Sequence, residues 1–514
     1  MKKYLRHLQA DLPAGLVVFL VALPLCLGIA LGSQAPLFSG IIAGIVGGIV
    51  IGVLSGSPLS VSGPAAGLTT IVAAAILKLP TFESFLLAVV LAGFFQLILG
   101  FLKAGILGDY VPNSVIKGML AAIGLILILK QLPHLVGFDK DFLGDESFLQ
   151  TDKENTFTEL MNAFNYLTPG ATLVGIISIL ILILFEQKNI KSNRWLGKIP
   201  GPLVVVAIGL ILNEVFRIQG SDLMIQQEHL VNLPVAKDSQ GFFALFSMPD
   251  FNALTNFNVW SVALTIAIVA SLETLLSIEA IDKLDPYKRA TPNNRELKAQ
   301  GVGNIVSGML GGLPVTSVIV RSSANVNSGA NSKASTIIHG FLLLISVILI
   351  PGLLNKIPLS ALAAILIFTG YKLAKISLVK EFFEKGWDQF IPFAVTIIAI
   401  LLTDLLIGIF IGIGVALFFM IRSNFRTNLL VINDNNHYLL RLRKDVSFLN
   451  KPIIKRRLED IPENSYILID TSRADYIDKD VIDVINEFKI HAGLKNIQVE
   501  IKKNEFNPMH NLIF

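Results

Sequence analysis

SGSPLSVSGPAAGLTTIVAAAILK, residues Ser55–Lys78, is an apolar segment whose first half is interrupted by Pro58, Gly63 and Pro64. A second interrupted segment, GGLPVTSVIVRSS at Gly311–Ser323, lies in the second half of the chain. Two such breaks in matching halves point to the binding site of a secondary transporter. A helix that starts inside the membrane exposes N–H groups at the positive end of its dipole, and these groups bind anions. The pair of breaks therefore predicts an anion carrier with its site between them.

The composition is that of an integral membrane protein. Of the 514 residues, 53% are hydrophobic and 16% are charged, whereas soluble domains carry about 25% charged residues. Residues 1–31 have the basic start and apolar run of a signal peptide, but Pro24 interrupts the run and no small-residue cleavage site stands out, so we expect a retained span. The single cysteine, Cys26, excludes a disulfide framework and a thiolate metal cluster. We expect it to be a small buried packing residue.

Apolar runs predict an α-helical polytopic membrane protein with about fourteen spans, seven in each half of the chain, divided near residues 218–255. A span needs about 20 apolar residues. Two weak runs, near 299–310 and 317–327, are rich in Gly and Ser. The clear runs are 12–31, 37–54, 64–79, 83–102, 115–131, 169–185, 200–216, 258–278, 335–351, 358–371, 389–403 and 405–421.

The distribution of charge supports this count. Lys and Arg gather in cytoplasmic loops of membrane proteins. With fourteen spans, the basic N-terminus and the basic joints 103–117, 187–198, 282–298 and 372–385 all fall on the cytoplasmic side. The acidic loops 132–166 and 217–256 fall outside. We therefore expect a multi-pass protein of the cell (plasma) membrane with both termini in the cytoplasm.

The composition becomes polar after the last apolar run. We expect a transmembrane transport domain at 1–423, with repeats at about 1–217 and 257–423, and a small cytoplasmic α/β domain at 424–514. In the latter, strands are predicted at 437–443, 466–470 and 496–501, and helices at 451–460 and 480–490.

Glu273 is the most informative single residue because it lies well inside an apolar span, in IVASLETLLSI. A carboxylate at that depth costs at least about 2.5 kcal/mol, so it must be protonated, paired or facing a cavity. Ser277 lies one turn later on the same helix face. We interpret Glu273 as a coupling site for H⁺ or Na⁺; the alternative is a structural partner of a nearby cation.

Arg321 follows the second break, and it either neutralises Glu273 or adds positive potential to the start of the half-helix. We favour the second role because a guanidinium matches oxyanions and stays charged. The backbone after the first break, at Ala65 and Ala66, carries small side chains that leave its N–H groups accessible, and the same reasoning applies to Ser317 and Val318. The alternative for such small residues is close helix packing.

Other residues in the spans favour structural roles. His339 lies in an apolar run, where a buried imidazole with satisfied hydrogen bonds is a simpler interpretation than a proton relay. The chain contains no HExxH, GxxxxGK[ST], GxSxG or CxxC motif, so the sequence gives no support for enzymatic catalysis by those routes.

With these residues identified, the chain resembles the sulfate permease (SulP) family of anion transporters. The resemblance covers nearly the whole chain and rests on DLPAGLVVFLVALPLCLGIA from Asp11, SGPAAGLTTIV from Ser62, and NRELKAQGVGNIVSGMLGGLPVTSVIVRSSANVNSGA from Asn294. The tail resembles a STAS domain, chiefly in YILIDTSRADYID from Tyr466. The family implies a seven-plus-seven inverted repeat with core and gate domains, a substrate held between half-helices three and ten, and a homodimer.

The resemblance also implies roles for individual residues in cation coupling. Glu273 takes the place of the acidic residue of span eight, which is Asp in Na⁺-coupled bicarbonate members. Ser277 matches their hydroxyl one turn on, and Ser317 matches a span-ten backbone ligand. Na⁺ would therefore lie at Glu273, Ser277 and Ser317, although Glu in place of Asp leaves Na⁺ and H⁺ both open.

For the anion, the resemblance implies contacts at Ala65 and Ala66 in span three and at Val318 and Arg321 in span ten. Many sulfate-type members have Gln after the proline of span one, whereas Leu25 follows Pro24 here. Bicarbonate-type members have an apolar residue at that position, which favours bicarbonate. In the STAS-like region, DKD at 478–480 replaces the phosphorylatable serine of sigma-factor antagonists, so phosphorylation at that position is not expected.

The sequence thus predicts secondary active transport of an inorganic or small organic anion, with bicarbonate or sulfate favoured, coupled to Na⁺ or H⁺. No cofactor is expected beyond the coupling ion, and the expected partners are membrane lipid and a cytoplasmic protein at the STAS-like domain, with no nucleic acid. The alternatives are an anion exchanger or channel of the same fold, a nucleobase carrier, and a membrane-anchored regulator acting through the STAS-like domain.

Overall fold

The computed structural model describes residues 7–140, 155–191, 199–233, 245–427 and 429–503. The chain forms two compact units, Met1–Ile413 and Gly414–Phe514, and each is described by itself. The division falls within one helix, α21 (Leu405–Thr427), while the domain boundary at 423 stays a prediction. The basic residues 1–6 and 192–198 and the acidic residues 141–154 and 234–244, which entered the charge argument, lie outside the described residues.

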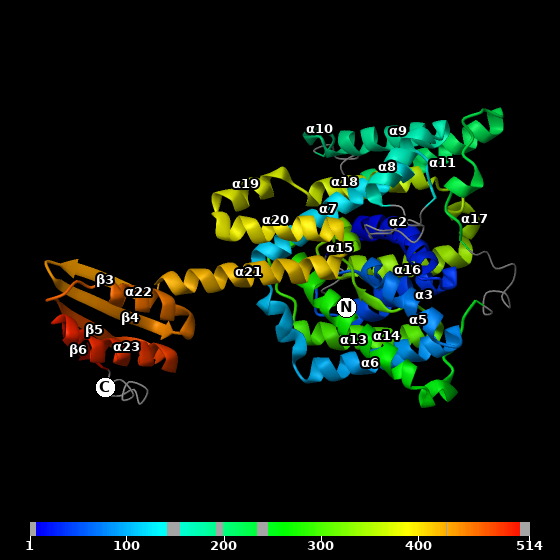
Figure 1. Ribbon diagram of the computed structural model, residues 1–514. Coiled ribbons are helices and arrows are strands. Elements are labelled where there is room, and N and C mark those ends of the chain that lie inside the picture. The colour runs from blue at the N-terminus through cyan, green and yellow to red at the C-terminus, as the bar shows by residue number, and fades with distance from the viewer. Residues whose placement is uncertain (1–6, 141–154, 192–198, 234–244, 428, 504–514) are drawn as a thin grey trace. The chain divides into compact units, whose positions relative to one another are not determined.

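The first unit consists almost entirely of helices (Figure 1). Those of the first half are α2 (Leu8–Gly32), α3 (Leu37–Val46) continued by the π-turn η1 (Gly47–Ile51) and α4 (Gly52–Leu54), α5 (Thr69–Lys78), α6 (Phe82–Phe101), α7 (Asn113–Leu135), α8 (Thr156–Asn165), α9 (Pro169–Glu186), α10 (Lys188–Lys191) and α11 (Gly201–Gln219). Those of the second half are α13 (Phe257–Leu284), α14 (Asn293–Leu310), α15 (Ile319–Asn327), α16 (Ala334–Leu349), α17 (Pro351–Leu354), α18 (Leu359–Leu373), α19 (Ile376–Glu384), α20 (Trp387–Leu402) and α21.

The fourteen predicted spans each correspond to a helical segment. Among the described residues, nine segments are long and apolar enough to cross a membrane, and three shorter apolar helices accompany them, namely Ala66–Lys78, Ala334–Leu349 and Trp387–Leu402. The two weak runs of the sequence form α14 and α15. Seven segments precede residue 220 and seven follow residue 256, so the chain is an α-helical polytopic membrane protein.

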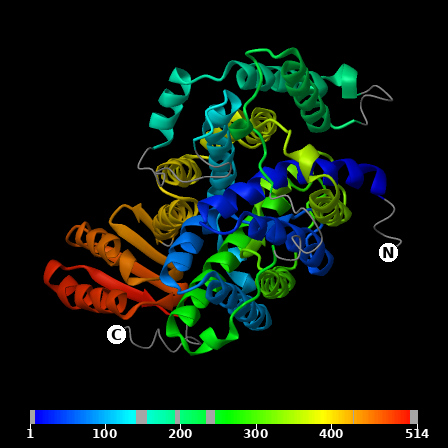
Figure 2. The same cartoon turned by 90° about the vertical axis from the view of Figure 1, so that its right-hand side faces the viewer.

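The helices pack as two groups. The core group contains the first four spans of each half: α2, α3, α5 and α6 with α13, α14, α15 and α16. The gate group contains the last three of each half: α7, α9 and α11 with α18, α20 and α21. In Figure 2, helices α9 and α11 of the gate group, coloured teal to green, lie above the dark-blue helix α2 of the core group. The division agrees with the core and gate domains that the resemblance implied.

Small residues permit the close approach of α6 and α14 in the core group. A Cβ built on Gly93 of α6 would lie 2.5 Å from the carbonyl oxygen of Gly301 in α14, and one built on Gly301 would lie 2.7 Å from the carbonyl oxygen of Gly93. Helix pairs in membranes use such positions because lipid supplies no hydrophobic drive between helices. Alanine at either position would force the helices apart.

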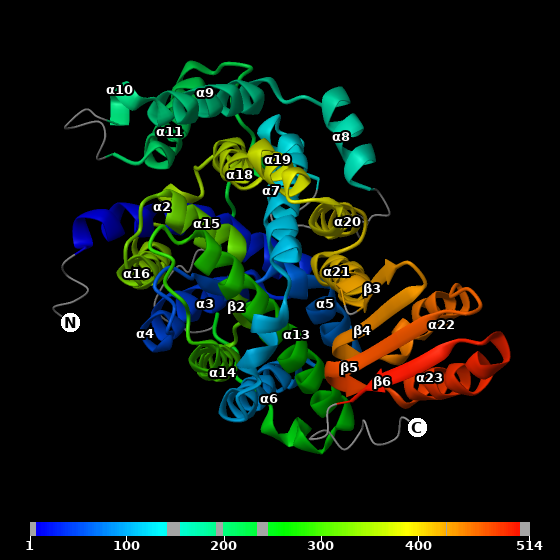
Figure 3. The same ribbon diagram turned by 90° about the vertical axis from the view of Figure 1, so that its left-hand side faces the viewer.

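The second unit contains a four-stranded sheet in the order β3–β4–β5–β6. β3 (Leu429–Asp434) is antiparallel to β4 (His437–Val446), and β5 (Tyr466–Ile477) and β6 (Gln498–Lys502) continue in parallel. The helices α22 (Lys451–Glu459) and α23 (Lys479–Ala492) contact each other and share an apolar core with the sheet (Figure 3). This α/β unit is consistent with a STAS domain, and Asp478 of the DKD stretch accepts a hydrogen bond from the Asp480 N–H to cap α23.

Candidate anion-binding site

The two interrupted segments meet in a short two-stranded bridge. β1 (Ser62–Pro64) pairs antiparallel with β2 (Val315–Ser317), with Gly63 opposite Thr316. Side chains extend the bridge, because Ser60 Oγ lies 2.6 Å from Ser317 Oγ and the Val61 N–H donates to Ser322 Oγ at 2.8 Å. Segments more than 250 positions apart in the chain therefore form one local structure.

Each strand of the bridge leads directly into a helix start. After β1, Ala65 is extended and the 3₁₀ turn η2 (Ala66–Leu68) continues into α5. After β2, Val318 is extended and α15 begins. The first N–H groups of a helix have no partner within it, and Ala66 and Gly67 are only half-buried in an otherwise buried stretch. Two positive dipole ends thus lie on either side of the bridge.

Neither Ser317 nor Val318 offers the free amide that the sequence interpretation assigned to both residues. The Ser317 N–H donates to Thr274 Oγ1 at 3.3 Å. The Val318 N–H donates to the carbonyl oxygen of Val61 at 3.0 Å and so belongs to the bridge. The strand pairing that engages this group could not be seen in the sequence. The N–H groups that helix geometry leaves for a ligand begin one residue later, at Ile319 and Val320, although Val318 itself is half-buried beside them.

Arg321 is fully buried at the third position of α15. Its Nη2 donates to the Pro64 carbonyl oxygen at 3.3 Å, and its guanidinium fills the space beside Gly63, where a Cβ would lie 3.0 Å from Cζ. Within the described part of the chain, Nε and Nη1 have no hydrogen-bond partner. The guanidinium therefore adds a fixed charge to the positive ends of the half-helices, and the Cys26 side chain lies within hydrogen-bond reach of it.

Glu273 lies beside the start of the first half-helix. It is 5% exposed in α13, and a Cβ built on Gly67 would lie 3.1 Å from its Oε1. The next residue, Thr274, accepts a hydrogen bond from the Ser317 N–H at 3.3 Å, and Ser277 is buried one turn further along α13. The predicted coupling residues thus come from α13 and from the bridge, and they offer the oxygen ligands that hard cations take.

A buried polar network supports the bridge from α14. Asn304 accepts from the Val315 N–H at 2.6 Å, donates to the Val315 carbonyl oxygen at 2.9 Å, and donates to Gln96 Oε1 at 2.7 Å. Gln300 donates to Ser62 Oγ at 2.8 Å. Leaving a buried amide group without its hydrogen bond costs about 1–3 kcal/mol. These contacts therefore hold the two helix starts in register.

Three functional candidates escaped the sequence interpretation. Ser60 and Thr274 position Ser317 through the contacts given above. Thr69 is buried at the first position of α5, and its Oγ1 has no partner among the described residues. Hydroxyl residues are common in membrane helices, so composition and spacing could not distinguish these three from the many others.

Cys26 lies close enough to Arg321 for a side-chain hydrogen bond, whereas His339 is affected only by the charge of the same guanidinium. Both are fully buried, as expected for Cys26. Neither ring nitrogen of His339 has a protein hydrogen-bond partner among the described residues, so the described side chains do not supply the satisfied imidazole that we expected. The lack of protein partners for the His339 ring depends on tertiary packing around it, which the apolar run in the sequence does not reveal.

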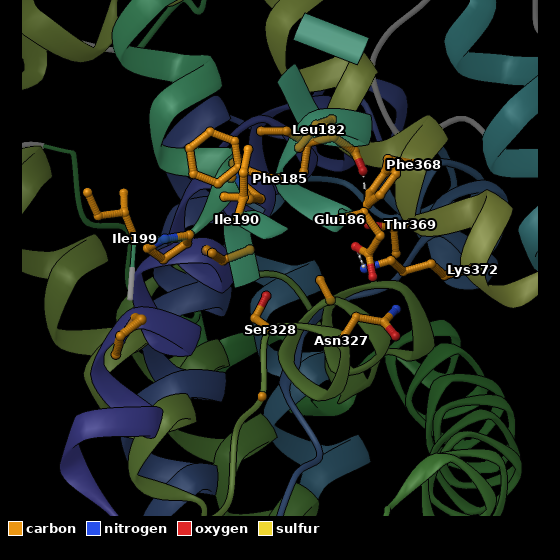
Figure 4. A pocket seen from close by; sticks show the side chains of 18 of the residues that line it. Leu182, Phe185, Glu186, Ile190, Ile199, Asn327, Ser328, Phe368, Thr369 and Lys372 are labelled. Carbon is orange, nitrogen blue, oxygen red and sulfur yellow. Dashed lines mark hydrogen bonds and ion pairs between the residues drawn. The ribbon is translucent and has the colours of Figure 1, made fainter. Parts of the chain in front are cut away.

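A cavity of about 690 Å³ opens at the opposite end of α15 from the bridge (Figure 4). Asn327 and Ser328 line it from the end of α15, and Glu186 and Lys372 line it from α9 and α18, paired at 2.8 Å. It therefore lies between members of the core and gate groups. The groups suited to binding an anion lie at the other end of α15, where the half-helix starts and the Arg321 guanidinium come together.

The comparisons with known proteins agree with this architecture. The family model described as "Sulfate permease family" matches residues 8–400 of this chain. YvdB of Bacillus subtilis (strain 168), which carries the name of a sulfate transporter, is 27% identical over 449 residues, covering 86% of this chain and 79% of YvdB. The bicarbonate transporter BicA of Synechocystis sp. is 27% identical over 421 residues, covering 81% and 70% of the two chains.

The solved structure of SLC26A9 aligns with a TM-score of 0.67 at 16% identity, covering 98% of this chain and 85% of that chain, and so shows the shared fold. Members of the matched family are membrane transporters and not enzymes. The family model covers residues 8–400, and the polytopic helical unit with its two half-helices and buried guanidinium agrees with it. The chain therefore belongs to the sulfate permease family of membrane anion transporters.

Proposed function

We propose that the chain is a secondary active transporter that moves a small oxyanion, bicarbonate or sulfate, together with Na⁺ or H⁺. The observation that carries the proposal is Arg321. Its buried charge lies at the third position of a helix, where the dipole is already positive. A buried cation is costly without a counter-charge, and an oxyanion supplies that charge while accepting hydrogen bonds from the guanidinium.

In this proposal the anion lies between the start of η2, at Ala66 and Gly67, and the start of α15. Ala65 adds a further contact before η2, and Val318 borders the position without donating its amide, which is bonded to Val61. Arg321 supplies the fixed charge, and the half-helix N–H groups supply orientation. Oxyanions suit this arrangement because their several oxygens accept from donors that converge from two directions.

The coupling ion is assigned to Glu273, which lies against Gly67. Na⁺ would be held by Glu273 with Ser277 and Ser317, and H⁺ would bind the Glu273 carboxylate itself. In either case the cation offsets a carboxylate whose burial in a membrane span costs at least about 2.5 kcal/mol. A cation at Glu273 and an anion at Arg321 each make the other's binding more favourable, which is the physical basis of coupling.

Two observations support the choice of anions and the transport cycle. Relatives that are 27% identical carry the names of a sulfate transporter and a bicarbonate transporter, and Leu25 is apolar as in bicarbonate-type members. The cavity between the core and gate groups is where relative movement would open and close access to the bridge. Localisation to the cell membrane, cytoplasmic termini and a homodimer remain part of the proposal.

The experiment is uptake of labelled bicarbonate, sulfate and fumarate into proteoliposomes, with and without Na⁺ and pH gradients. The proposal predicts saturable uptake of one of these anions that depends on a cation gradient, and loss of that dependence in Glu273→Gln. Unchanged ion dependence in Glu273→Gln would remove the coupling assignment. Conductance beyond carrier rates would indicate a channel, and competition by uracil would indicate a nucleobase carrier. After deletion of residues 426–514 a carrier should keep residual transport, whereas a membrane-anchored regulator should lose its only output.

A further inference from the structure

Glu296 is a fully buried carboxylate in the first turn of α14, and the site described above does not use it. Its Oε2 accepts a hydrogen bond from Ser55 Oγ at 2.5 Å, and its Oε1 accepts one from Gln300 Nε2 at 3.0 Å. The backbone N–H groups of Gly56 and Ser57 lie within hydrogen-bond reach of the same carboxylate. Donors thus converge on both oxygens, which suits a carboxylate because it has about four lone-pair sites and no donor.

One route leads from Glu296 along the turn that precedes the first half-helix. Ser55 Oγ accepts from the Ser57 N–H at 3.0 Å, and Ser57 Oγ accepts from the Ser60 N–H at 3.2 Å. Ser60 Oγ in turn lies 2.6 Å from Ser317 Oγ on the other strand of the bridge. All four serines are buried. Irregular backbone inside a membrane protein needs partners within the protein, and here serine hydroxyls supply them one after another.

A second route leads from Glu296 through α14. Gln300 lies one turn after Glu296, and its Nε2 also donates to Ser62 Oγ at 2.8 Å. Ser62 is directly opposite Ser317 in the pairing of β1 with β2. The two routes therefore end on the two members of one residue pair, which belongs to the bridge that leads into both half-helices.

Positive charge holds the other side of the same turn. Lys333 Nζ donates to the carbonyl oxygens of Val53 and Ser55 at 2.9 and 3.1 Å, and Arg295 Nε donates to the Leu54 carbonyl oxygen at 3.0 Å. Cations at the end of a helix interact favourably with its last carbonyl groups. The turn is thus fixed by cations on its carbonyl side and by Glu296 on its N–H side.

We propose that Glu296 is a further positioning residue of the anion site, which fixes the Ser62–Ser317 pair and through it the two half-helix starts. The inference rests on the proposed function, because the groups that Glu296 orients are the proposed ligands of the anion. Glu296 contacts neither the anion nor the coupling ion. Its loss should therefore lower the affinity of the site and leave the dependence on a cation gradient in place.

The test measures the concentration dependence of labelled bicarbonate and sulfate uptake in proteoliposomes containing the full chain. Glu296→Gln keeps the shape of the side chain, but it leaves one acceptor oxygen and turns an NH2 group towards the donors. It should raise the KM of the transported anion about 5- to 50-fold, the effect of one or two lost hydrogen bonds, with little change in kcat. Ser346→Ala is the control, because it removes a buried hydroxyl that donates to the Leu343 carbonyl oxygen in its own helix.

A double-mutant cycle separates positioning from a general loss of stability. Ser55→Ala cuts the serine route and Gln300→Met cuts the glutamine route, so each should give part of the rise in KM. Because both routes run through Glu296, each should add much less to the KM in the Glu296→Gln background than in wild type.

Full additivity of these effects, an unchanged KM in Glu296→Gln, or an equal rise in Ser346→Ala overturns the inference. Loss of the cation dependence in Glu296→Gln also overturns it, because that result would make Glu296 a coupling residue. If Glu296→Gln does not fold, the double variant Ser55→Ala/Gln300→Met replaces it, since it cuts both routes and keeps the carboxylate. An unchanged KM in that variant overturns the inference as well.

The outcome is separable from that of the proposed function. Wild-type protein that transports neither anion counts against the proposed function. Wild-type protein that transports one of them, with Glu296 variants of the same KM, counts against the role of Glu296 alone.

Discussion

Gly63→Ala tests whether the position of Arg321 determines anion affinity. The added Cβ would overlap Nη1 of Arg321 and lie 3.0 Å from its Cζ, compared with about 3.5–4.0 Å for a comfortable carbon contact. The guanidinium must therefore move by roughly 1 Å, since the backbone on the other side is fixed by the pairing of Gly63 with Thr316. Such a movement breaks the bond from Nη2 to Pro64.

The cost follows from that bond. Hydrogen bonds to a charged group contribute about 1.5–3 kcal/mol. The same movement displaces the Arg321 donors that would bind the anion, so the free energy of anion binding should weaken by a similar amount. We expect Gly63→Ala to weaken anion binding by about 10- to 100-fold, with an intact fold because the clashing atom is the end of a side chain. The assay is the concentration dependence of uptake in proteoliposomes, with Gly352→Ala as the control, since a Cβ there has nothing within 4 Å. Wild-type affinity in Gly63→Ala would refute the reasoning.

Two further substitutions examine other parts of the molecule. Gly67→Ala places a Cβ 3.1 Å from Glu273 Oε1, so we expect it to raise the cation concentration for half-maximal uptake several-fold while changing saturation by the anion less; the opposite pattern would place Glu273 away from the coupling ion. His229→Gln tests the buried cluster in which His134 Nδ1 and His229 Nδ1 each lie 2.6 Å from an oxygen of Asp139. The hydrogen bond to Asp139 raises the pKa of His229, so its contribution to stability is complete below the ordinary pKa of about 6.5 and declines as pH rises through the higher folded value. Burial opposes ionisation of Asp139, but the two imidazoles lower its pKa below the usual 3.8, so its contribution is lost only in acid. The difference in melting temperature between wild type and His229→Gln should therefore be largest near pH 5–6 and shrink towards pH 9; a difference that grows with pH would contradict the assignment.

The spans could be predicted from the sequence because lipid requires long apolar runs, and even the weak spans α14 and α15 followed from the alternation of charge between loops. The breaks were visible because proline and glycine interrupt those runs. Glu273 and Arg321 could also be picked out as candidate site residues, since charges inside apolar segments are rare, and their roles stay predictions.

Other features depend on contacts between distant segments and could not be predicted. The use of the Val318 N–H by Val61 follows from strand pairing across more than 250 positions. The placement of Thr274 behind Ser317 depends on how α13 packs against β2. The lack of protein partners for the His339 imidazole depends on which helices surround it. In each case the residue type is ordinary for a membrane helix, and only its neighbours distinguish it.

Equilibrium binding of labelled sulfate and bicarbonate to the purified protein tests the central claim most directly, by comparing wild type with Arg321→Gln. Gln keeps a polar side chain of moderate length but removes the charge and the paired donors. The account predicts saturable binding of at least one of these anions to wild type and at least a tenfold loss in Arg321→Gln, with melting temperatures close enough to show that both proteins are folded. Equal affinity in two folded proteins would contradict the claim that the buried guanidinium between the half-helices holds the anion.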